Sequence, residues 1–176
     1  MNNPVLLKNL RCIPDFPKKG INFRDVTTLY KNPECMKIMV DEMYELYKDK
    51  GITKIVGIES RGFVMAAALA TKLGAGVVLA RKPGKLPATV IKESFSKEYG
   101  VDTVEMHIDS IDGNDVVLIH DDLLATGGTA KATLKLVNHF HPKKVYMNFI
   151  IEITDEGLHG RDCLEKDVEV TTLMVI

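Results

Sequence analysis

Four short segments rich in β-branched residues limit what this chain can fold into. Each has apolar residues on both faces, which is typical of strands in a sheet covered on both sides; they are Lys54–Ile58, Gly76–Ala80, Asp115–Ile119 and Val145–Ile151. Two helical stretches, Gly62–Leu73 and Gly128–Phe140, each begin at a glycine-bearing turn directly after such a strand. This alternation predicts an α/β, doubly wound fold with a mainly parallel sheet.

The length of the chain predicts one domain, residues 1–176, with a single core. For 176 residues, folding buries roughly 70% of the surface of the unfolded chain. No repeat, low-complexity stretch or charge block divides the sequence. A further helix is predicted to start at Asn32-Pro33, an N-cap followed by proline at the first helical position, and to be closed by Gly51.

The balance of charges excludes several kinds of partner. Lys and Arg total 23 and Asp and Glu total 24, so no global basic field exists to hold nucleic acid or an anionic membrane. The longest apolar run, Phe63–Ala70, is far shorter than the roughly 20 residues of a spanning helix. The N-terminal residues lack a secretory hydrophobic segment. We therefore expect a cytoplasmic protein with neither a nucleic acid nor a membrane as partner.

The three cysteines are scattered, without a CxxC pair. This pattern argues against a disulfide framework and against a zinc site. The role expected for Cys12, Cys35 and Cys163 is packing.

One loop carries most of the chemical information. Ligands of open α/β sheets bind beyond the carboxyl ends of the strands, which directs attention to the turns after Ile58 and Ile119. After Ile119 the chain reads HDDLLATGGT. Gly127 and Gly128 allow close approach of a ligand to the backbone, and the first N–H groups of the following helix form an anion site. Hydroxyls of two threonines can add donors, so this turn predicts a phosphate site.

The two acids in the same loop, Asp121 and Asp122, cannot be phosphate ligands. Adjacent carboxylates at a strand end need hydroxyl donors or a divalent cation, and a sugar diol beside a magnesium ion would supply both. The alternative is that the acids merely end the strand and the glycines form a hinge. The fixed order of acids, small residues and helix start favours the ligand site. Neither GxxxxGK[ST] nor GxGxxG spacing is present, so a P-loop or dinucleotide site is not supported.

The segment DDLLATGGT after an apolar strand resembles the phosphoribosyl pyrophosphate (PRPP) signature of type I phosphoribosyltransferases. The resemblance implies that Asp121 and Asp122 face the ribose 2- and 3-hydroxyls. It also implies that the 5-phosphate is wrapped by Ala125, Thr126, Gly127, Gly128 and Thr129. Mg2+ is the implied cofactor, carried by PRPP rather than held directly by the protein. His120 stands where the family more usually has an apolar residue, and we interpret it as a core histidine.

Three further segments narrow the resemblance. They are IPDFPKKGINFRDVT at 13–27, GIESRGF at 57–63, and RKPGKLP at 81–87 together with SKEYG at 96–100. In order and spacing they are similar to the adenine phosphoribosyltransferases of the short, bacterial type. This resemblance implies a homodimer and a type I phosphoribosyltransferase fold.

The turn after Ile58 predicts a second anion site. The backbone amides of Ser60 and Gly62 and the side chain of Arg61 can bind pyrophosphate. The alternative is that Arg61 is a surface ion-pair partner and Gly62 only starts a helix. The family resemblance implies a cis peptide between Glu59 and Ser60.

The segment at about 81–100 is rich in cations and poor in continuous apolar pattern, which suits a mobile lid that excludes water. A solvated loop is the alternative, and we accept it for Lys92 and Lys97. The family pattern implies that Arg81 and Lys85 lie on the pyrophosphate side. It also implies roles for Tyr99 and for Glu98, the latter near the base.

The N-terminal segment, about 1–30, is predicted to recognise the base. The resemblance implies that Phe23 lies against one face of the purine and Leu123 against the other. Arg24 is expected close by, with the backbone around Asn22 reading the purine edge.

The implied reaction joins adenine to PRPP and gives AMP and pyrophosphate. Glu98 is the best candidate to accept or stabilise the ring proton that adenine loses, while Asp121 and Asp122 favour positive charge on the ribose. A phosphoribosyltransferase for another purine is the nearer alternative. A PRPP-sensing regulatory protein is the more distant alternative. It would need a DNA-binding module or a basic face, and 176 residues at a net charge of -1 leave room for neither.

Overall fold

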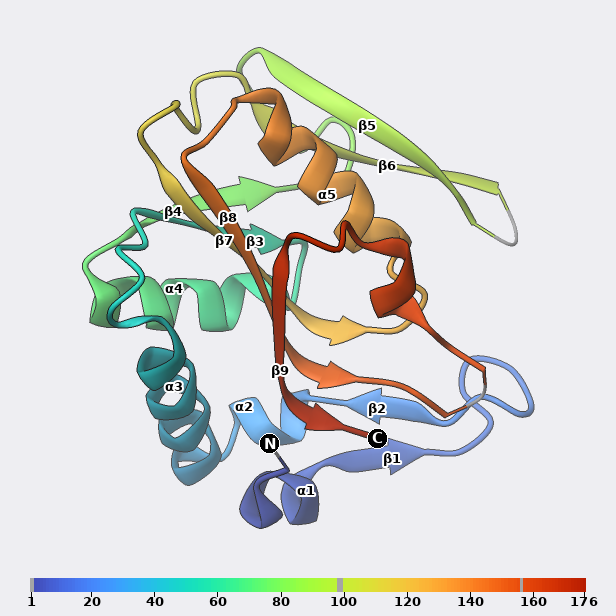
Figure 1. The fold of residues 1–176 in the computed structure, drawn as a ribbon. Helices are drawn as coiled ribbons and strands as arrows, with labels where there is room; N and C mark the ends of the chain where they lie inside the picture. Colours follow the sequence, from blue (N-terminus) through green and yellow to red (C-terminus); the bar gives the residue numbers. More distant parts are fainter. Residues whose placement is uncertain (1, 98–99, 156) are drawn as a thin grey trace.

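A five-stranded parallel sheet in the order β4-β3-β7-β8-β9 forms the centre of the molecule (Figure 1). The structure is a computed structural model and describes residues 2–97, 100–155 and 157–176. Helices cover both faces of the sheet, so the predicted α/β, doubly wound architecture is confirmed.

Three of the four predicted strands occur close to the expected bounds, as β3 (Lys54–Ile58), β4 (Gly76–Ala80) and β8 (Lys144–Glu152). The fourth, β7, runs over Val116–Leu124 and so continues five residues past Ile119. The expectation that the acids lie beyond the strand end is wrong, because β8 pairs with β7 as far as Leu124 opposite Glu152. A fifth strand, β9 (Glu169–Val175), was not predicted.

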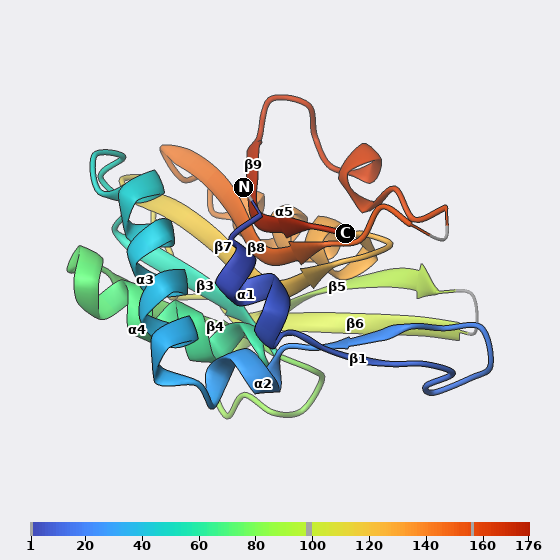
Figure 2. The same cartoon turned by 90° about the horizontal axis from the view of Figure 1, so that it is seen from below.

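One face of the sheet carries the helices α3 (Pro33–Tyr47) and α4 (Gly62–Leu73), with the short helices α1 (Pro4–Asn9) and α2 (Thr27–Tyr30) beside them (Figure 2). The Asn32 side chain caps α3 as predicted, accepting from Glu34 N at 2.9 Å. The helix ends at Tyr47, earlier than expected.

The other face carries α5 (Gly128–His139) and an antiparallel hairpin of β5 (Val90–Lys97) and β6 (Gly100–His107). The hairpin occupies much of the segment that was expected to be a loop-like lid. The sequence of β5, VIKESFSK, alternates only partly between apolar and polar residues. This weak alternation is why the strand was not predicted. Whether this segment moves stays a prediction.

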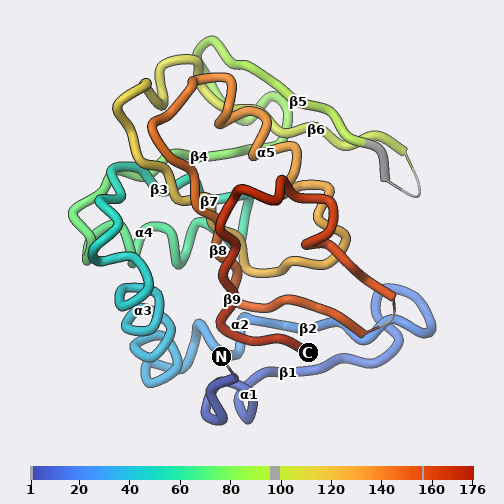
Figure 3. The backbone as a smooth tube through the Cα atoms, in the orientation of Figure 1, coloured from blue at the N-terminus to red at the C-terminus, as the bar shows by residue number. Residues whose placement is uncertain are grey.

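The N-terminal segment forms a second antiparallel pair, β1 (Arg11–Ile13) with β2 (Phe23–Asp25). The two chain ends lie close together (Figure 3), where Asn2 bonds both backbone groups of Val175. The short 3-10 helix η1 (Gly160–Cys163) lies between β8 and β9 in the sequence.

The cysteines only partly follow the packing expectation. Cys35 is buried and Cys163 is half-buried, whereas Cys12 is exposed and accepts a hydrogen bond from Arg24 at 3.1 Å. Over the residues that the structure describes, no helix is long and apolar enough to cross a membrane.

Candidate active site

The predicted phosphate loop joins the end of β7 to the start of α5. Gly127 precedes the helix with φ +78°, a left-handed conformation that glycine adopts without strain. Ala125 to Thr129 line a pocket of about 100 Å³ at this helix start. Backbone N–H groups at such a terminus are unpartnered within the helix and favour an anion.

Asp121 and Asp122 lie in the last part of β7 and both line the pocket beside the turn after β3. Asp122 is buried and forms an ion pair with Arg61. Asp121 accepts a hydrogen bond from the backbone N–H of Asp122 at 2.9 Å. Burial, together with the charge of Asp122, raises the pKa of Asp121 well above its ordinary value. A hydroxyl donor or a cation at this position would therefore stabilise the ionised pair.

The turn after β3 contains the cis peptide implied between Glu59 and Ser60, so that expectation is confirmed. Gly62 starts α4 in direct contact with β7. A Cβ at this position would lie 2.7 Å from the carbonyl oxygen of His120 and 3.1 Å from a carboxylate oxygen of Asp121. The glycine thus allows the turn to approach the acids closely.

Arg81 follows β4 and lies beside the same turn. Its guanidinium donates to the Glu59 carboxylate, with Nε to Oε2 at 3.2 Å, and to the Lys85 carbonyl at 3.1 Å. The backbone N–H of Lys82 also donates to Glu59 at 2.9 Å. This N–H and the Arg81 guanidinium lower the pKa of the Glu59 carboxyl. Lys85 itself is exposed.

Three neighbouring pockets share Asp121 and bring the predicted elements together. The first is the pocket at the phosphate loop. The second, of about 320 Å³, is lined by Glu59, Ser60, Arg61, Lys82, Asp121 and Asp122. The third, of about 210 Å³, extends from Arg81 to Thr129 along β6. The two acids, the phosphate loop and the turn at 59–62 that is predicted to bind pyrophosphate (the pyrophosphate turn) therefore line adjoining pockets at the carboxyl ends of the strands.

The N-terminal segment, which is predicted to recognise the base, reaches this region through Phe23. Its ring centre lies 5.8 Å from the Arg61 guanidinium carbon and 5.2 Å from the Phe16 ring centre, edge to face. Leu123 is half-buried on β7, and Asn22 is exposed just before β2. Arg24 bonds Asp155 at 2.9 Å, so its guanidinium is held by the chain after β8.

Two predicted site residues, Glu98 and Tyr99, lie outside the described residues. His120 is fully buried, as expected, with Nδ1 3.0 Å from the side-chain oxygen of Asn148. Its Nε2 has no hydrogen-bond partner in the described part of the chain. Burial lowers the pKa of His120 to about 4, so the ring is neutral at pH 7.

Sequence reasoning missed several supporting residues. Glu59, which holds Arg81, and Lys82, which lines two of the pockets, both stand inside quoted motifs but were given no role. Tyr30, whose hydroxyl donates to the Arg61 carbonyl at 3.2 Å, and Asp155 are far in sequence from their partners. Only their position inside those motifs could have indicated Glu59 and Lys82.

The protein donors suit a magnesium ion that brings its own ligands. Within residues 2–97, 100–155 and 157–176, no group of three or more His, Cys, Asp or Glu side chains could hold a metal. Asp121 and Asp122 both line the second pocket, of about 320 Å³, and Arg61 already neutralises Asp122. Mg2+ that keeps several waters and substrate phosphates needs only one or two carboxylates.

The fold and sequence match known proteins closely. Residues 25–167 match the family described as "Phosphoribosyl transferase domain". An adenine phosphoribosyltransferase from Phocaeicola vulgatus is 60% identical over 176 residues, covering 100% of both chains.

Solved structures agree. The enzyme of that name from Rhodothermus marinus has a TM-score of 0.91 at 46% identity, covering 98% of this chain and 97% of the other. The Giardia lamblia enzyme, complexed with 9-deazaadenine, has a TM-score of 0.92 at 38% identity, covering 100% and 98%. The Trypanosoma brucei enzyme, in complex with AMP, pyrophosphate and ribose-5-phosphate, has a TM-score of 0.87 at 28% identity, covering 97% and 78%. The chain therefore belongs to the phosphoribosyltransferase family and, within it, to the adenine phosphoribosyltransferases.

Proposed function

We propose that this chain transfers the 5-phosphoribosyl group of PRPP to adenine, giving AMP and pyrophosphate in a purine salvage step. The observation that carries this function is the sharing of Asp121 by three pockets, which joins a phosphate loop, a pair of acids and a second anion turn. PRPP presents a monophosphate, a diol and a diphosphate in the same order.

The ribose and its 5-phosphate are bound by the end of β7 and the start of α5. Amides of the turn from Ala125 to Thr129 hold the phosphate. Asp121 and Asp122 accept from the ribose hydroxyls and stabilise positive charge as the bond to pyrophosphate breaks. The raised pKa of Asp121 supports this role, because a cationic ribose restores the ionised form.

The leaving pyrophosphate is bound by the backbone amides of Ser60 and Gly62 and by Arg61, Arg81 and Lys85. Glu59 orients the Arg81 guanidinium at the pocket wall. Asp121 and Asp122 would lie near a Mg2+ ion carried by PRPP, which would supply charge neutralisation to the diphosphate. Positive charge around the leaving group lowers the barrier to bond breaking.

Adenine binds between Phe23 and Leu123, with Arg24 close by and the backbone at Asn22 reading its edge. The nucleophilic ring nitrogen attacks the ribose C1 with inversion and loses its proton, which Glu98 accepts. Glu98 and Tyr99 both belong to the predicted lid, about 81–100. The segment that recognises the base spans about 1–30. The pairing of Phe23 with the Arg61 side chain supports a base site next to the pyrophosphate turn.

The enzyme acts as a homodimer in the cytoplasm. β4 is an edge strand of the sheet, and its residues Val77 and Leu79 are exposed, whereas Val78 and Ala80 pack into the core. Val64 is exposed on α4. Such apolar side chains suit contact with a second copy. A cytoplasmic location fits PRPP, a polyanion that does not cross a membrane unaided.

Initial rates with PRPP, Mg2+ and each of adenine, guanine, hypoxanthine and xanthine test the function. We expect AMP formation with adenine and rates at least about 100-fold lower with the others, because a site that hydrogen-bonds the 6-amino group of adenine rejects bases that carry an oxygen at that position. A preference for another purine would reassign the substrate. PRPP binding without turnover of any base would favour a regulatory protein.

A further inference from the structure

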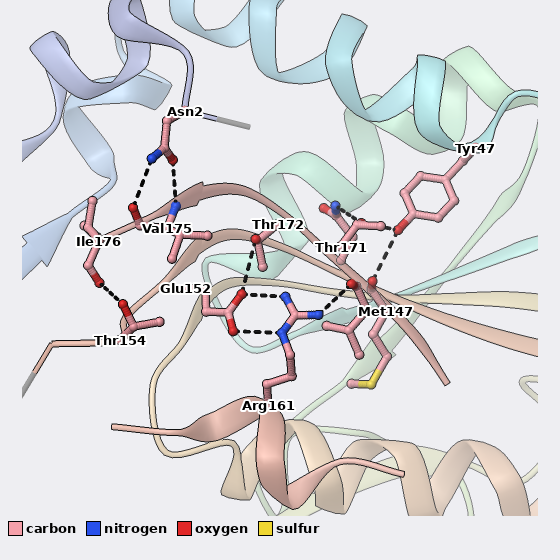
Figure 4. Close-up of polar contacts among 12 residues, drawn as sticks. Asn2, Tyr47, Met147, Glu152, Thr154, Arg161, Thr171, Thr172, Val175 and Ile176 are labelled. Atoms are coloured by element: carbon pink, nitrogen blue, oxygen red, sulfur yellow. Dashed lines mark hydrogen bonds and ion pairs between the residues drawn. The ribbon is translucent and has the colours of Figure 1, made fainter. Parts of the chain in front are cut away.

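A forked ion pair lies behind the phosphate loop. Arg161 of η1 donates to both carboxylate oxygens of Glu152, with Nε to Oε1 at 2.8 Å and Nη2 to Oε2 at 2.5 Å (Figure 4). Its remaining nitrogen, Nη1, donates to the Val170 carbonyl at 2.8 Å, and Thr172 donates to Glu152 at 3.3 Å. The pair therefore joins η1 to the ends of two strands.

Glu152 lies next to the strand that enters the phosphate loop. It is the last residue of β8 and pairs with Leu124, the last residue of β7, while the next amide, Ile153 N, donates to the Leu124 carbonyl at 2.9 Å. Glu152 is only 8% exposed. A buried carboxylate needs its partner, so the position of Arg161 is fixed relative to the strand end.

Two other residues of η1, Gly160 and Cys163, contact the phosphate loop directly. The thiol of Cys163 donates to the carbonyls of Gly160 at 3.0 Å and Thr126 at 3.6 Å. A Cβ on Gly160 would lie 3.0 Å from the backbone nitrogen of Gly127 and closer still to the Ala125 carbonyl oxygen. Since both neighbours are backbone atoms, any side chain at position 160 would have to displace the loop.

We propose that Arg161 and Gly160 are positioning residues for the 5-phosphate site. The ion pair with Glu152 holds η1 in place, and the bare backbone at Gly160 forms the rear wall of the loop from Ala125 to Gly127. The wall fixes the loop amides in the orientation that binds phosphate before the ligand arrives, which removes part of the ordering entropy of binding. This role rests on the proposed function, and it sets PRPP affinity without touching PRPP.

The pyrophosphate turn gives an internal reference for the test. It follows β3 and shares a pocket with Asp121, and over the part of the chain that the structure describes no hydrogen bond or ion pair joins residues 59–62 to η1. A defect in the rear wall therefore weakens a ligand of the loop and spares a ligand of the turn. General loss of stability would affect both.

The experiment titrates the full chain calorimetrically with ribose 5-phosphate and, separately, with magnesium pyrophosphate. The variants are Arg161→Met, which removes the fork, Arg161→Lys, which keeps the charge, and Gly160→Ala, which keeps the ion pair but fills the wall. The matched controls are Lys50→Met, which breaks the ion pair to Glu169, the first residue of β9, but leaves the Arg161–Glu152 pair intact, and Gly113→Ala, where a Cβ has 3.6 Å to its nearest neighbour.

We expect Arg161→Met and Gly160→Ala to bind ribose 5-phosphate about tenfold more weakly and pyrophosphate within about twofold of wild type, as for the loss of one or two hydrogen bonds. Arg161→Lys should recover part of the affinity, and the controls should match wild type. Unchanged ribose 5-phosphate binding, or equal loss of both ligands, in folded variants would overturn the proposal. If Arg161→Met does not fold, Gly160→Ala decides alone. A wild-type protein that binds neither ligand would instead reject the proposed function.

Discussion

Arg61 and Asp122 form an ion pair that joins the turn after β3 to the pair of acids on β7. Asp122 is buried, whereas the Arg61 side chain is 43% exposed, so the arginine can leave the pair at lower cost than the acid. Under the proposed function, the hydroxyls of PRPP satisfy Asp122 and its diphosphate accepts from Arg61. The proposal therefore implies that the two residues neutralise each other until PRPP separates them.

Replacement of Arg61 should affect ligands according to whether they carry a diphosphate. We expect Arg61→Ala to weaken PRPP and pyrophosphate by about 10-fold or more, as for a charged hydrogen bond, and AMP by much less. Calorimetric titration of the three ligands measures this. Lys72→Ala, at the far end of α4, is the control, because the partners of Lys72 among the described residues are Asp41 and Tyr44 of α3. Equal loss for all three ligands would make Arg61 structural.

Both acids should be needed for turnover. Asp121→Asn and Asp122→Asn should each lower kcat/KM by a factor that corresponds to roughly 1.5–3 kcal/mol, the range for hydrogen bonds to charged groups. Steady-state rates with PRPP as the varied substrate measure the effect. Unchanged or improved catalysis in both variants would refute the ribose assignment.

The same Asp121→Asn variant should also be more stable than the wild type at pH 7. Because the folded-state pKa of Asp121 is raised, the stability this carboxyl provides when protonated is lost as pH rises from its ordinary value of 3.8 through the folded value. The amide has no such loss and keeps the acceptor for the Asp122 N–H. Thermal unfolding should give a higher Tm for the variant at pH 7 and a smaller difference near pH 4. A lower Tm at pH 7 contradicts the argument.

The fold could be predicted largely because its signals are local. Strand length, apolar faces and glycine turns lie within a few residues of each other, and β3, β4 and α4 begin and end as expected. The end of β7 was misplaced because adjacent acids are typical of turns, whereas pairing with β8 holds them in the strand. The hairpin of β5 and β6 was missed because charges interrupt its alternation.

The site could be predicted only as far as its residues are contiguous. The phosphate loop and the pyrophosphate turn are runs of neighbours in the sequence, so their chemistry can be inferred from the residues in order. The pairs Arg24–Asp155 and Arg61–Asp122 join residues far apart in the chain. Such contacts depend on which strand ends the topology brings together, and no local pattern encodes them.

Glu98 should matter for rate more than for binding. We expect Glu98→Gln to keep the fold and PRPP binding but to lose about 100-fold or more in kcat, because the nearly isosteric amide cannot take a proton. The control is Glu93→Gln on β5, where the acid pairs with Lys135 on the surface of α5. Single-turnover rates and calorimetric PRPP titration test the split. A kcat near the wild-type value would remove Glu98 from the mechanism.

His120 should make the fold sensitive to mild acid. Burial lowers its pKa from 6.5 to about 4, with Asn148 and Asp122 opposing the shift, so the folded protein holds the ring neutral. The unfolded chain binds a proton below about pH 6.5, whereas the folded chain does so only near pH 4. Stability should therefore fall as pH drops through this window, by about 3 kcal/mol in total.

The variant His120→Val separates this effect from other acid sensitivity. Valine suits a buried strand position and cannot titrate, so its unfolding free energy should change less between pH 6.5 and 4 than that of the wild type. His139→Gln, near the end of α5, is the control, because His139 lies outside the buried polar groups of the core. Urea unfolding of the three proteins at several pH values provides the measurement. If the unfolding free energies of His120→Val and wild type changed in parallel with pH, His120 would contribute nothing to the acid response. Asn148 and Asp122 would then have to stabilise the charged ring enough to offset its burial.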